Sequence, residues 1–123
     1  MKEMRKERPS TGYRKSSMME QIAAFVDDHL QEKITLKTIA AHCGVSISTV
    51  TQLFQKRSDT TFHNFVTLRR MIMAEKLIGE GVPLEQAGKQ VGYQDHSTFY
   101  RAFRSHFGVS PREFRSRLYK ENE

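Results

Sequence analysis

Residues 91–114 read VGYQDHSTFYRAFRSHFGVSPREF, and this stretch contains the start and end signals of two consecutive helices. Asp95 is a residue type that caps helix N-termini, and the apolar positions that follow, beginning with Phe99, recur at helical spacing. Gly108 is placed to end that helix, and Pro111 is suited to the first position of the next one. The stretch therefore predicts two helices separated by a glycine turn.

A second copy of this design lies earlier in the chain. The positions Leu36, Ala40 and Gly44 recur 48 residues later as Leu84, Gly88 and Gly92. Beyond the glycine the offset is 49, and it aligns Val50, Leu53 and Phe54 with Phe99, Ala102 and Phe103. Each copy is a short helix, a glycine turn and a second helix, and a longer helical pattern ending at Gly79 separates them. Because no segment alternates as a half-buried strand would, the sequence predicts an all-α fold with two helix-turn-helix subdomains joined by a linking helix.

The predicted organisation has four parts. The first residues carry many charges, with Pro9 and Gly12 and almost nothing to bury, which is typical of a disordered basic arm or a linker remnant. A capping box at Ser17–Glu20 is expected to start the ordered part. The parts are an arm at residues 1–16, a first helix-turn-helix subdomain at 17–60, a linking helix at 61–81 and a second subdomain at 82–120.

The composition limits the class of protein. Twenty Lys and Arg against fourteen Asp and Glu give a net charge of +6, which suits a polyanionic partner such as nucleic acid. The longest unbroken apolar stretch, Ile22 to Val26, is far shorter than the ~20 residues that a membrane-spanning helix needs. The single cysteine, Cys43, excludes an internal disulfide framework and fits a reducing cytoplasm. We therefore expect a cytoplasmic protein without a membrane partner.

Residue types that act in catalysis or metal binding in other proteins form no such pattern in this sequence. The five histidines include no pair at three- or four-residue spacing, so metal ligation is not indicated. Cys43 adjoins His42, but its place just before the turn at Gly44 favours a small buried hydrophobe over a nucleophile. The chain also has no glycine-rich phosphate loop. The sequence thus predicts a protein that is not an enzyme and that uses no cofactor or metal.

The second helix of each copy has a polar face opposite its apolar one. At about 100° per residue, Ser97, Tyr100, Arg101 and Arg104 share one arc, and Ser48, Thr51, Gln52 and Gln55 share the matching arc in the first copy. Such a face fits the DNA major groove, where Arg101 suits guanine and Gln52 suits adenine. A single polar face is commonly a solvated surface, but two matching faces favour DNA recognition.

Over about residues 17–119 the chain resembles the DNA-binding domain of the AraC/XylS family of bacterial transcription regulators. The resemblance is most specific in residues 91–115, and it extends to Leu36–Ala40, Gly44–Ser46 and Leu53–Lys56, and to Arg70 and Ala74 in the linking helix. It implies seven helices, with two recognition helices in successive major grooves about one helical turn apart. It also implies a regulator that binds double-stranded DNA and activates transcription with RNA polymerase; the sequence does not reveal an effector.

The expected DNA contacts form two sets, of which the resemblance implies the first. Base contacts are expected from Ser48, Thr51, Gln52, Ser97, Tyr100 and Arg101. Contacts to the DNA backbone are expected from Ile47, Thr49, Gln55, Lys56, Thr61, His96, Thr98, Arg104, Ser110 and Arg112. The first recognition helix has only uncharged side chains, among them Ser48 and Thr51, at its base-contacting positions. We therefore expect the second recognition helix to provide most of the discrimination between DNA sequences. Two alternatives remain open: a helical protein-interaction module, and the excised output domain of a larger ligand-sensing or response regulator.

Overall fold

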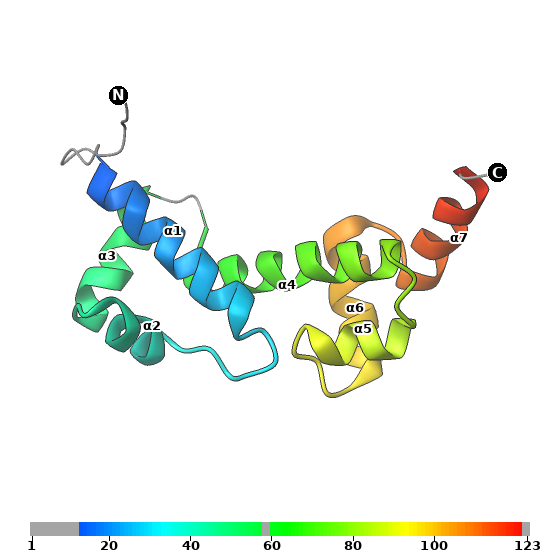
Figure 1. Ribbon diagram of the computed structural model, residues 1–123, viewed down its shortest axis with the longest axis horizontal. Helices are drawn as coiled ribbons and strands as arrows, with labels where there is room; N and C mark the ends of the chain where they lie inside the picture. The colour runs from blue at the N-terminus through cyan, green and yellow to red at the C-terminus, as the bar shows by residue number, and fades with distance from the viewer. Residues whose placement is uncertain (1–12, 58–59, 122–123) are drawn as a thin grey trace, which may run out of the picture.

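The computed structural model describes residues 13–57 and 60–121 of the chain (Figure 1). Within these ranges the chain forms seven helices and no strand. The helices are α1 (Tyr13–Asp28), α2 (Leu36–Cys43), α3 (Ile47–Arg57), α4 (Phe62–Gly79), α5 (Leu84–Gln90), α6 (His96–Phe107) and α7 (Pro111–Glu121). The predicted all-α fold is therefore confirmed.

The helices gather at the two ends of α4, as Figure 1 shows. Helices α1, α2 and α3 form the first subdomain, in which α2 packs on both α1 and α3. Helices α5, α6 and α7 form the second subdomain, in which α6 packs on both α5 and α7. Helix α4 contacts α1 in the first subdomain and all three helices of the second. It is thus the linking helix expected from the repeat.

Helix α1 begins earlier than predicted. The capping box at Ser17–Glu20 was expected to mark its start, but the helix begins at Tyr13. The prediction of an arm was therefore wrong for residues 13–16, and residues 1–12 of the predicted arm lie outside the described ranges. After Gly12 the sequence contains no glycine or proline before the apolar run, so nothing stops the helix from extending backwards by one turn.

The helix caps of the two copies form as predicted. Gly44 follows α2 with φ of 70°, in the left-handed region where glycine is favoured. The Ser46 side-chain oxygen accepts a hydrogen bond of 3.0 Å from the backbone N–H of Thr49 at the start of α3. The Asp95 carboxylate accepts one of 2.9 Å from the backbone N–H of Thr98 in α6. These caps fix where α3 and α6 begin, and hence which side chains lie on each face.

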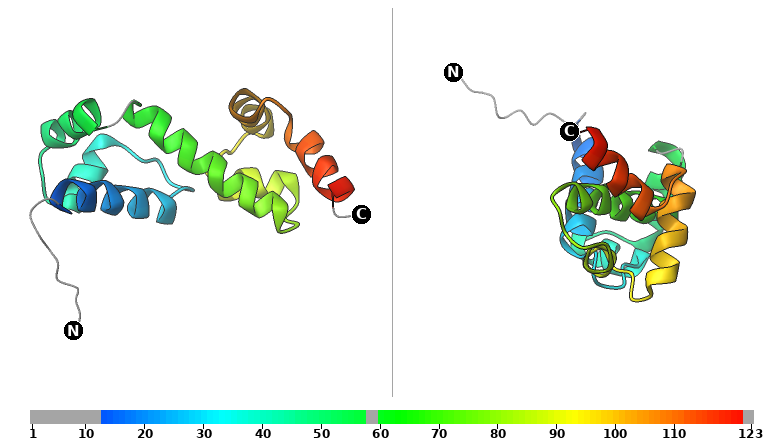
Figure 2. Two further views of the ribbon diagram at one scale, coloured as in Figure 1. Left: turned by 90° about the horizontal axis from the view of Figure 1, so that it is seen from above. Right: turned by 90° about the vertical axis from the view of Figure 1, so that its right-hand side faces the viewer.

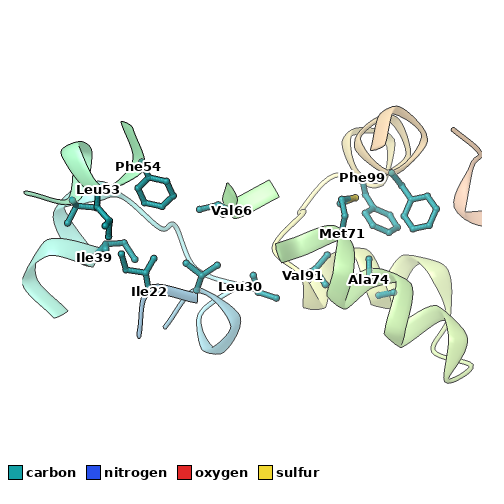
Figure 3. Packing of buried hydrophobic residues seen from close by; sticks show 14 of the residues in the cluster. Ile22, Leu30, Ile39, Leu53, Phe54, Val66, Met71, Ala74, Val91 and Phe99 are labelled. Carbon is teal, nitrogen blue, oxygen red and sulfur yellow. The ribbon is translucent and has the colours of Figure 1, made fainter. Parts of the chain in front are cut away.

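The buried side chains form one continuous cluster with two denser groups (Figure 3). Ile22 and Phe54 belong to the group in the first subdomain, and Phe99 belongs to the group in the second. In Figure 3 the side chains of Leu30 and Val66 lie between these groups. Leu30 is only 4% exposed although it lies in the connection after α1, so the core continues through the middle of the molecule.

Gly88 allows α5 and α6 to pack closely in the second subdomain. A Cβ atom added to Gly88 would lie 2.8 Å from Cδ2 of the Phe99 ring, closer than two carbon atoms can approach without displacing each other. The corresponding residues of the first subdomain are Ala40 and Val50. The larger side chain in α6 is therefore accompanied by the loss of a methyl group in α5.

Candidate nucleic-acid interface

Helices α3 and α6 are each anchored by an apolar face. In α3 this face is formed by Val50, Leu53 and Phe54, which are buried. In α6 it is formed by Phe99 and Phe103, which are fully buried. Because the apolar face of an amphipathic helix is held against the core, its polar face is turned to solvent. The sequence prediction of two helices with outward polar faces is thus consistent with the observed packing.

The two helices lie on the same side of the molecule. In the view from above in Figure 2, α3 and α6 both lie along one edge, and in the end-on view they again share a side. The first subdomain carries α3 to one end of α4, and the second carries α6 to the other end. Two polar helix faces are therefore presented in succession along one surface, which is the arrangement that a duplex with repeating grooves requires.

The expected base-contacting residues have matching exposure in the two helices. Ser48 and Gln52 are exposed in α3, and Thr51 between them is half-buried. Ser97 and Arg101 are exposed in α6, and Tyr100 is half-buried. The Tyr100 ring rests beside the His96 ring, with centroids 4.7 Å apart. The structure thus brings each predicted triplet to one helix surface and leaves its longest polar side chain, Gln52 or Arg101, free to extend outward.

The residues expected at the DNA backbone surround these two faces. Ile47 and Thr49 lie in the first turn of α3, and His96 and Thr98 lie in the first turn of α6. Ser110 is half-buried and caps α7 through the N–H of Glu113. The remaining predicted residues are all exposed: Gln55, Lys56, Thr61, Arg104 and Arg112. Each of the ten is therefore at or near the surface, and their contacts to phosphate stay a prediction.

The N-terminal caps of α3 and α6 differ in charge. The cap of α3 is the neutral Ser46, whose hydroxyl shares a hydrogen bond of 2.9 Å with the hydroxyl of Thr49. The cap of α6 is Asp95, and hydrogen bonds from the Thr98 side chain and backbone, with the nearby charges of Arg101 and His96, hold the pKa of its carboxyl below the ordinary value. Asp95 therefore remains ionised at neutral pH and places a negative charge at the start of α6.

The Asp95 cap also occupies the Thr98 side chain. The Thr98 hydroxyl donates a hydrogen bond of 2.8 Å to the Asp95 carboxylate. A hydroxyl has one proton to donate, so in this arrangement Thr98 has none to offer to a phosphate oxygen. In the first subdomain Ser46 and Thr49 share one hydroxyl proton between them, which leaves the other proton for a phosphate. A hydroxyl proton is therefore available for the predicted contact to the DNA backbone at Thr49, but not for the one at Thr98.

Several arginines that the sequence left unassigned hold the fold together. Arg69 donates to both carboxylate oxygens of Asp27, with Nε 2.9 Å from Oδ1, and joins α4 to α1. Arg115 donates to the backbone carbonyl of Val82 and joins α7 to the connection after α4. Arg117 pairs with Glu113 in the same helix at 3.2 Å. Arg115 and Arg117 are therefore engaged within the protein. The contacts of Arg69 and Arg115 join residues that are distant in the chain, and such contacts leave no local sequence signal.

Two features of the described residues bear on metal binding and on catalysis. No group of three or more His, Cys, Asp or Glu side chains that could hold a metal ion occurs among residues 13–57 and 60–121. The Cys43 thiol is half-buried, and burial raises its pKa, which disfavours the thiolate needed by a nucleophile. Among the helices of the described ranges, none is long and apolar enough to cross a membrane.

Comparison with known proteins agrees with this geometry. A family described as a helix-turn-helix domain matches residues 39–117. The probable transcriptional regulator LumQ of Photobacterium leiognathi is 31% identical over 91 residues, which are 73% of this chain and 37% of LumQ. The regulatory protein SoxS of Escherichia coli K12 is 24% identical over 102 residues, which are 82% of this chain and 95% of SoxS. The chain thus spans little more than a third of one relative and nearly all of the other.

Solved structures share the fold. A transcriptional regulator of Chromobacterium violaceum, described as having an AraC-type DNA-binding domain, superposes with a TM-score of 0.77 at 22% identity, over 84% of this chain and 93% of that one. The DNA-binding domain of AdpA, solved in complex with a target DNA, superposes with a TM-score of 0.74 at 19% identity, over 84% of this chain and 94% of that one. At these identities the likeness is one of fold.

Proposed function

The chain belongs to the AraC/XylS family of helix-turn-helix transcription regulators, and from this premise we propose that it reads a specific DNA sequence with both α3 and α6. Each helix would occupy one of two successive major grooves on the same face of the duplex. The observation that carries the proposal is that α3 and α6 lie on one side of the molecule (Figure 2) and that each has a matching set of exposed polar residues. A solvated surface would have no reason to repeat the same arc of exposed side chains in both subdomains.

The base contacts follow from the side chains at the centre of each face. In α6 the exposed Arg101 has the donors to bind guanine O6 and N7 together, and it is flanked by Ser97 and Tyr100. In α3 the exposed Gln52 can donate to and accept from adenine at the same time. Arg101 adds a full charge to its hydrogen bonds, so the α6 contact would be the stronger of the two.

The backbone contacts would be made differently by the two subdomains. At α3 the neutral cap leaves the helix N-terminus and a hydroxyl proton of the Ser46–Thr49 pair to attract a phosphate. At α6 the negative Asp95 opposes a phosphate at that place, and the exposed Arg104 and Arg112 would provide the attraction instead. Lys56 would contribute a further contact from the C-terminal half of α3.

We also propose that the bound protein activates transcription by contacting RNA polymerase, as the family resemblance implies. Binding to a bacterial chromosome would locate it in the cytoplasm. Purified RNA polymerase and a template carrying the selected DNA site provide the test, because an activator raises the yield of transcript from that template. A lower yield would instead indicate a repressor, and an equal yield would contradict the proposed activation.

Selection from a random library of double-stranded DNA tests the main proposal. The protein should enrich sequences with two half-sites about one helical turn apart. Titration of a selected duplex at rising salt should then give a slope of log K against log salt near −0.9 for each phosphate contact, with about six to ten contacts. The same duplex with both half-sites scrambled is the control. Failure to enrich any sequence, together with no binding at low salt, would favour a protein-interaction module.

A further inference from the structure

Three segments that are distant in the chain meet between the two subdomains. They are the connection between α1 and α2 (residues 29–35), Arg70 of α4, and the turn between α5 and α6 (residues 91–95). The Arg70 Nη2 atom donates hydrogen bonds to the backbone carbonyls of Leu30 at 3.3 Å and Glu32 at 3.1 Å. The guanidinium carbon of Arg70 lies 5.9 Å from the centre of the Tyr93 ring. We call this meeting point the junction.

Gly92 brings the second subdomain directly against the first. A Cβ atom added at Gly92 would lie 2.1 Å from the carbonyl oxygen of Leu30 and 3.0 Å from Nε of Arg70. Its φ of 103° is also one that side-chain-bearing residues rarely adopt. Glycine is therefore required here both by the backbone conformation and by the closeness of the other subdomain.

The contact is tight enough to exclude water from the Nε atom of Arg70. The Nε atom of Arg70 is inaccessible to solvent and has no hydrogen-bond partner among the described residues. The buried Leu30 side chain, whose carbonyl accepts from Arg70, lies between the two groups of the core (Figure 3). The junction thus combines the polar contacts of Arg70 with two carbonyls and the apolar side chain of Leu30, which belongs to the continuous core.

The junction gives the two subdomains a second connection besides α4. A single helix between two bodies permits bending and twisting about its axis, whereas two separate points of attachment restrict both motions. We propose that the junction of Arg70 with Leu30, Glu32, Gly92 and Tyr93 fixes the distance and rotation between α3 and α6, and so sets the number of base pairs between the two half-sites. This inference rests on the proposed function for its consequence on DNA, but not for the rigidity itself.

A fixed spacing between α3 and α6 affects DNA binding because the grooves of the duplex repeat with each helical turn. One inserted base pair moves one half-site about 3.4 Å along the duplex and rotates it by roughly 35°. A rigid pair of recognition helices cannot follow this rotation, so one helix must leave its groove. A flexible pair can follow, and its affinity then depends little on the spacing. Arg70 is in this sense a positioning residue that need not touch DNA.

The rigidity can be measured without DNA. Spin labels at two exposed positions, Lys37→Cys in α2 and Glu85→Cys in α5, in a Cys43→Ala background report the distance between the subdomains. Arg70→Met removes the donors at a similar side-chain length, and we expect it to broaden the distance distribution. Arg115→Met is the matched control. Its guanidinium also binds a backbone carbonyl and has a buried Nε without a partner, but it lies wholly within the second subdomain and its contact with α4.

The spacing can then be measured on DNA selected by the unaltered protein. For that protein one inserted base pair should reduce affinity by about 100-fold, because one helix loses several base contacts. For Arg70→Met the reduction should be about tenfold or less, and Arg115→Met should behave like the unaltered protein. Arg70→Lys, which keeps the charge and some donors, should lie between them. A merely structural role for Arg70 would lower affinity equally at every spacing.

The outcomes separate the two hypotheses. A narrow distance distribution in Arg70→Met together with an unchanged penalty for the inserted base pair would overturn the junction's role. If the unaltered protein selects no DNA, the proposed function fails, but the spin-label distances still decide whether the junction holds the subdomains. Circular dichroism spectra establish whether each variant is folded. If Arg70→Met does not fold, the distance and spacing measurements are made on Arg70→Lys instead.

Discussion

Helix α3 starts at a neutral serine cap and carries uncharged residues on its outer face, whereas α6 starts at an ionised aspartate and carries two arginines there. Both helices are anchored by buried apolar residues and present the same arc of exposed positions. The two copies of the repeat thus share their geometry but differ in their distribution of charge. In the first subdomain attraction to phosphate would come from the helix terminus and Lys56, and in the second it would come from arginine side chains.

The largest expected effect concerns the anchoring of the two helices. Phe99→Ala should reduce the free energy of unfolding by about 3–5 kcal/mol, because it leaves a cavity where a fully buried ring contacts Tyr93 and Phe103. Val50→Ala, at the matching position of α3, should cost about 2 kcal/mol, since fewer buried groups are removed. Urea denaturation of both variants measures this. Equal losses for the two variants would contradict the larger contribution expected of Phe99.

The next effect concerns which helix reads the DNA sequence. Arg101→Ala should weaken binding to a selected duplex by about 1–3 kcal/mol and relax the preference at one base pair. Gln52→Ala should cost less, because its hydrogen bonds are uncharged. Arg117→Ala is the control, since it removes the same charge from an exposed side chain that pairs with Glu113 instead. Fluorescence anisotropy on selected and scrambled duplexes measures all three. An equal loss for Arg101→Ala on both duplexes would indicate contact to phosphate rather than to a base.

A smaller effect should follow from exchanging the charges of the two caps. Asp95→Asn keeps an oxygen that can cap α6 but removes the negative charge, so it should raise DNA affinity by about two- to fivefold at low salt. Ser46→Asp introduces that charge at α3 and should lower affinity by a similar factor. Both changes in DNA affinity should become smaller as the salt concentration increases. If Ser46→Asp leaves affinity unchanged, the N-terminus of α3 does not face a phosphate.

The smallest expected effect is the dependence of stability on pH. The pKa of Asp95 is lower in the folded protein than in the unfolded chain, so its contribution to stability is complete above about pH 4 and is lost as the pH falls through the lower, folded value. Thermal unfolding between pH 6 and pH 2 should therefore show a larger decrease in Tm for the unaltered protein than for Asp95→Asn. Ser46→Ala, which removes an uncharged cap, should shift Tm by the same amount at every pH. Parallel pH profiles for Asp95→Asn and the unaltered protein would contradict this.

Local signals in the sequence predicted most of the fold. Caps such as Ser46 and Asp95, and turn residues such as Gly44, act on their immediate neighbours, so their effect can be inferred from adjacent residues. The apolar repeat likewise determined which side of α3 and α6 would be buried. The start of α1 was wrong because a capping box indicates a favourable beginning without preventing a helix from starting one turn earlier.

Contacts between distant residues could not be predicted in this way. Arg70 and Gly92 each have ordinary neighbours in the sequence, and their roles depend on Leu30 and Glu32, some 40 to 60 residues earlier. The candidate site was predicted as a set of exposed positions, because exposure follows from helical periodicity. The hydrogen bond from the Thr98 hydroxyl to Asp95 could not be predicted, because it depends on the side-chain conformation at the cap.

The close packing of Gly88 against Phe99 means that the two halves of the protein are not interchangeable parts. If α6 were transplanted into the first subdomain, its phenylalanine would meet Ala40 rather than a glycine, and if α3 took the place of α6, its valine would leave a void. A hybrid that folds must therefore exchange α2 together with α3, or α5 together with α6. Each pair of helices is thus a matched set that has to be exchanged as a unit.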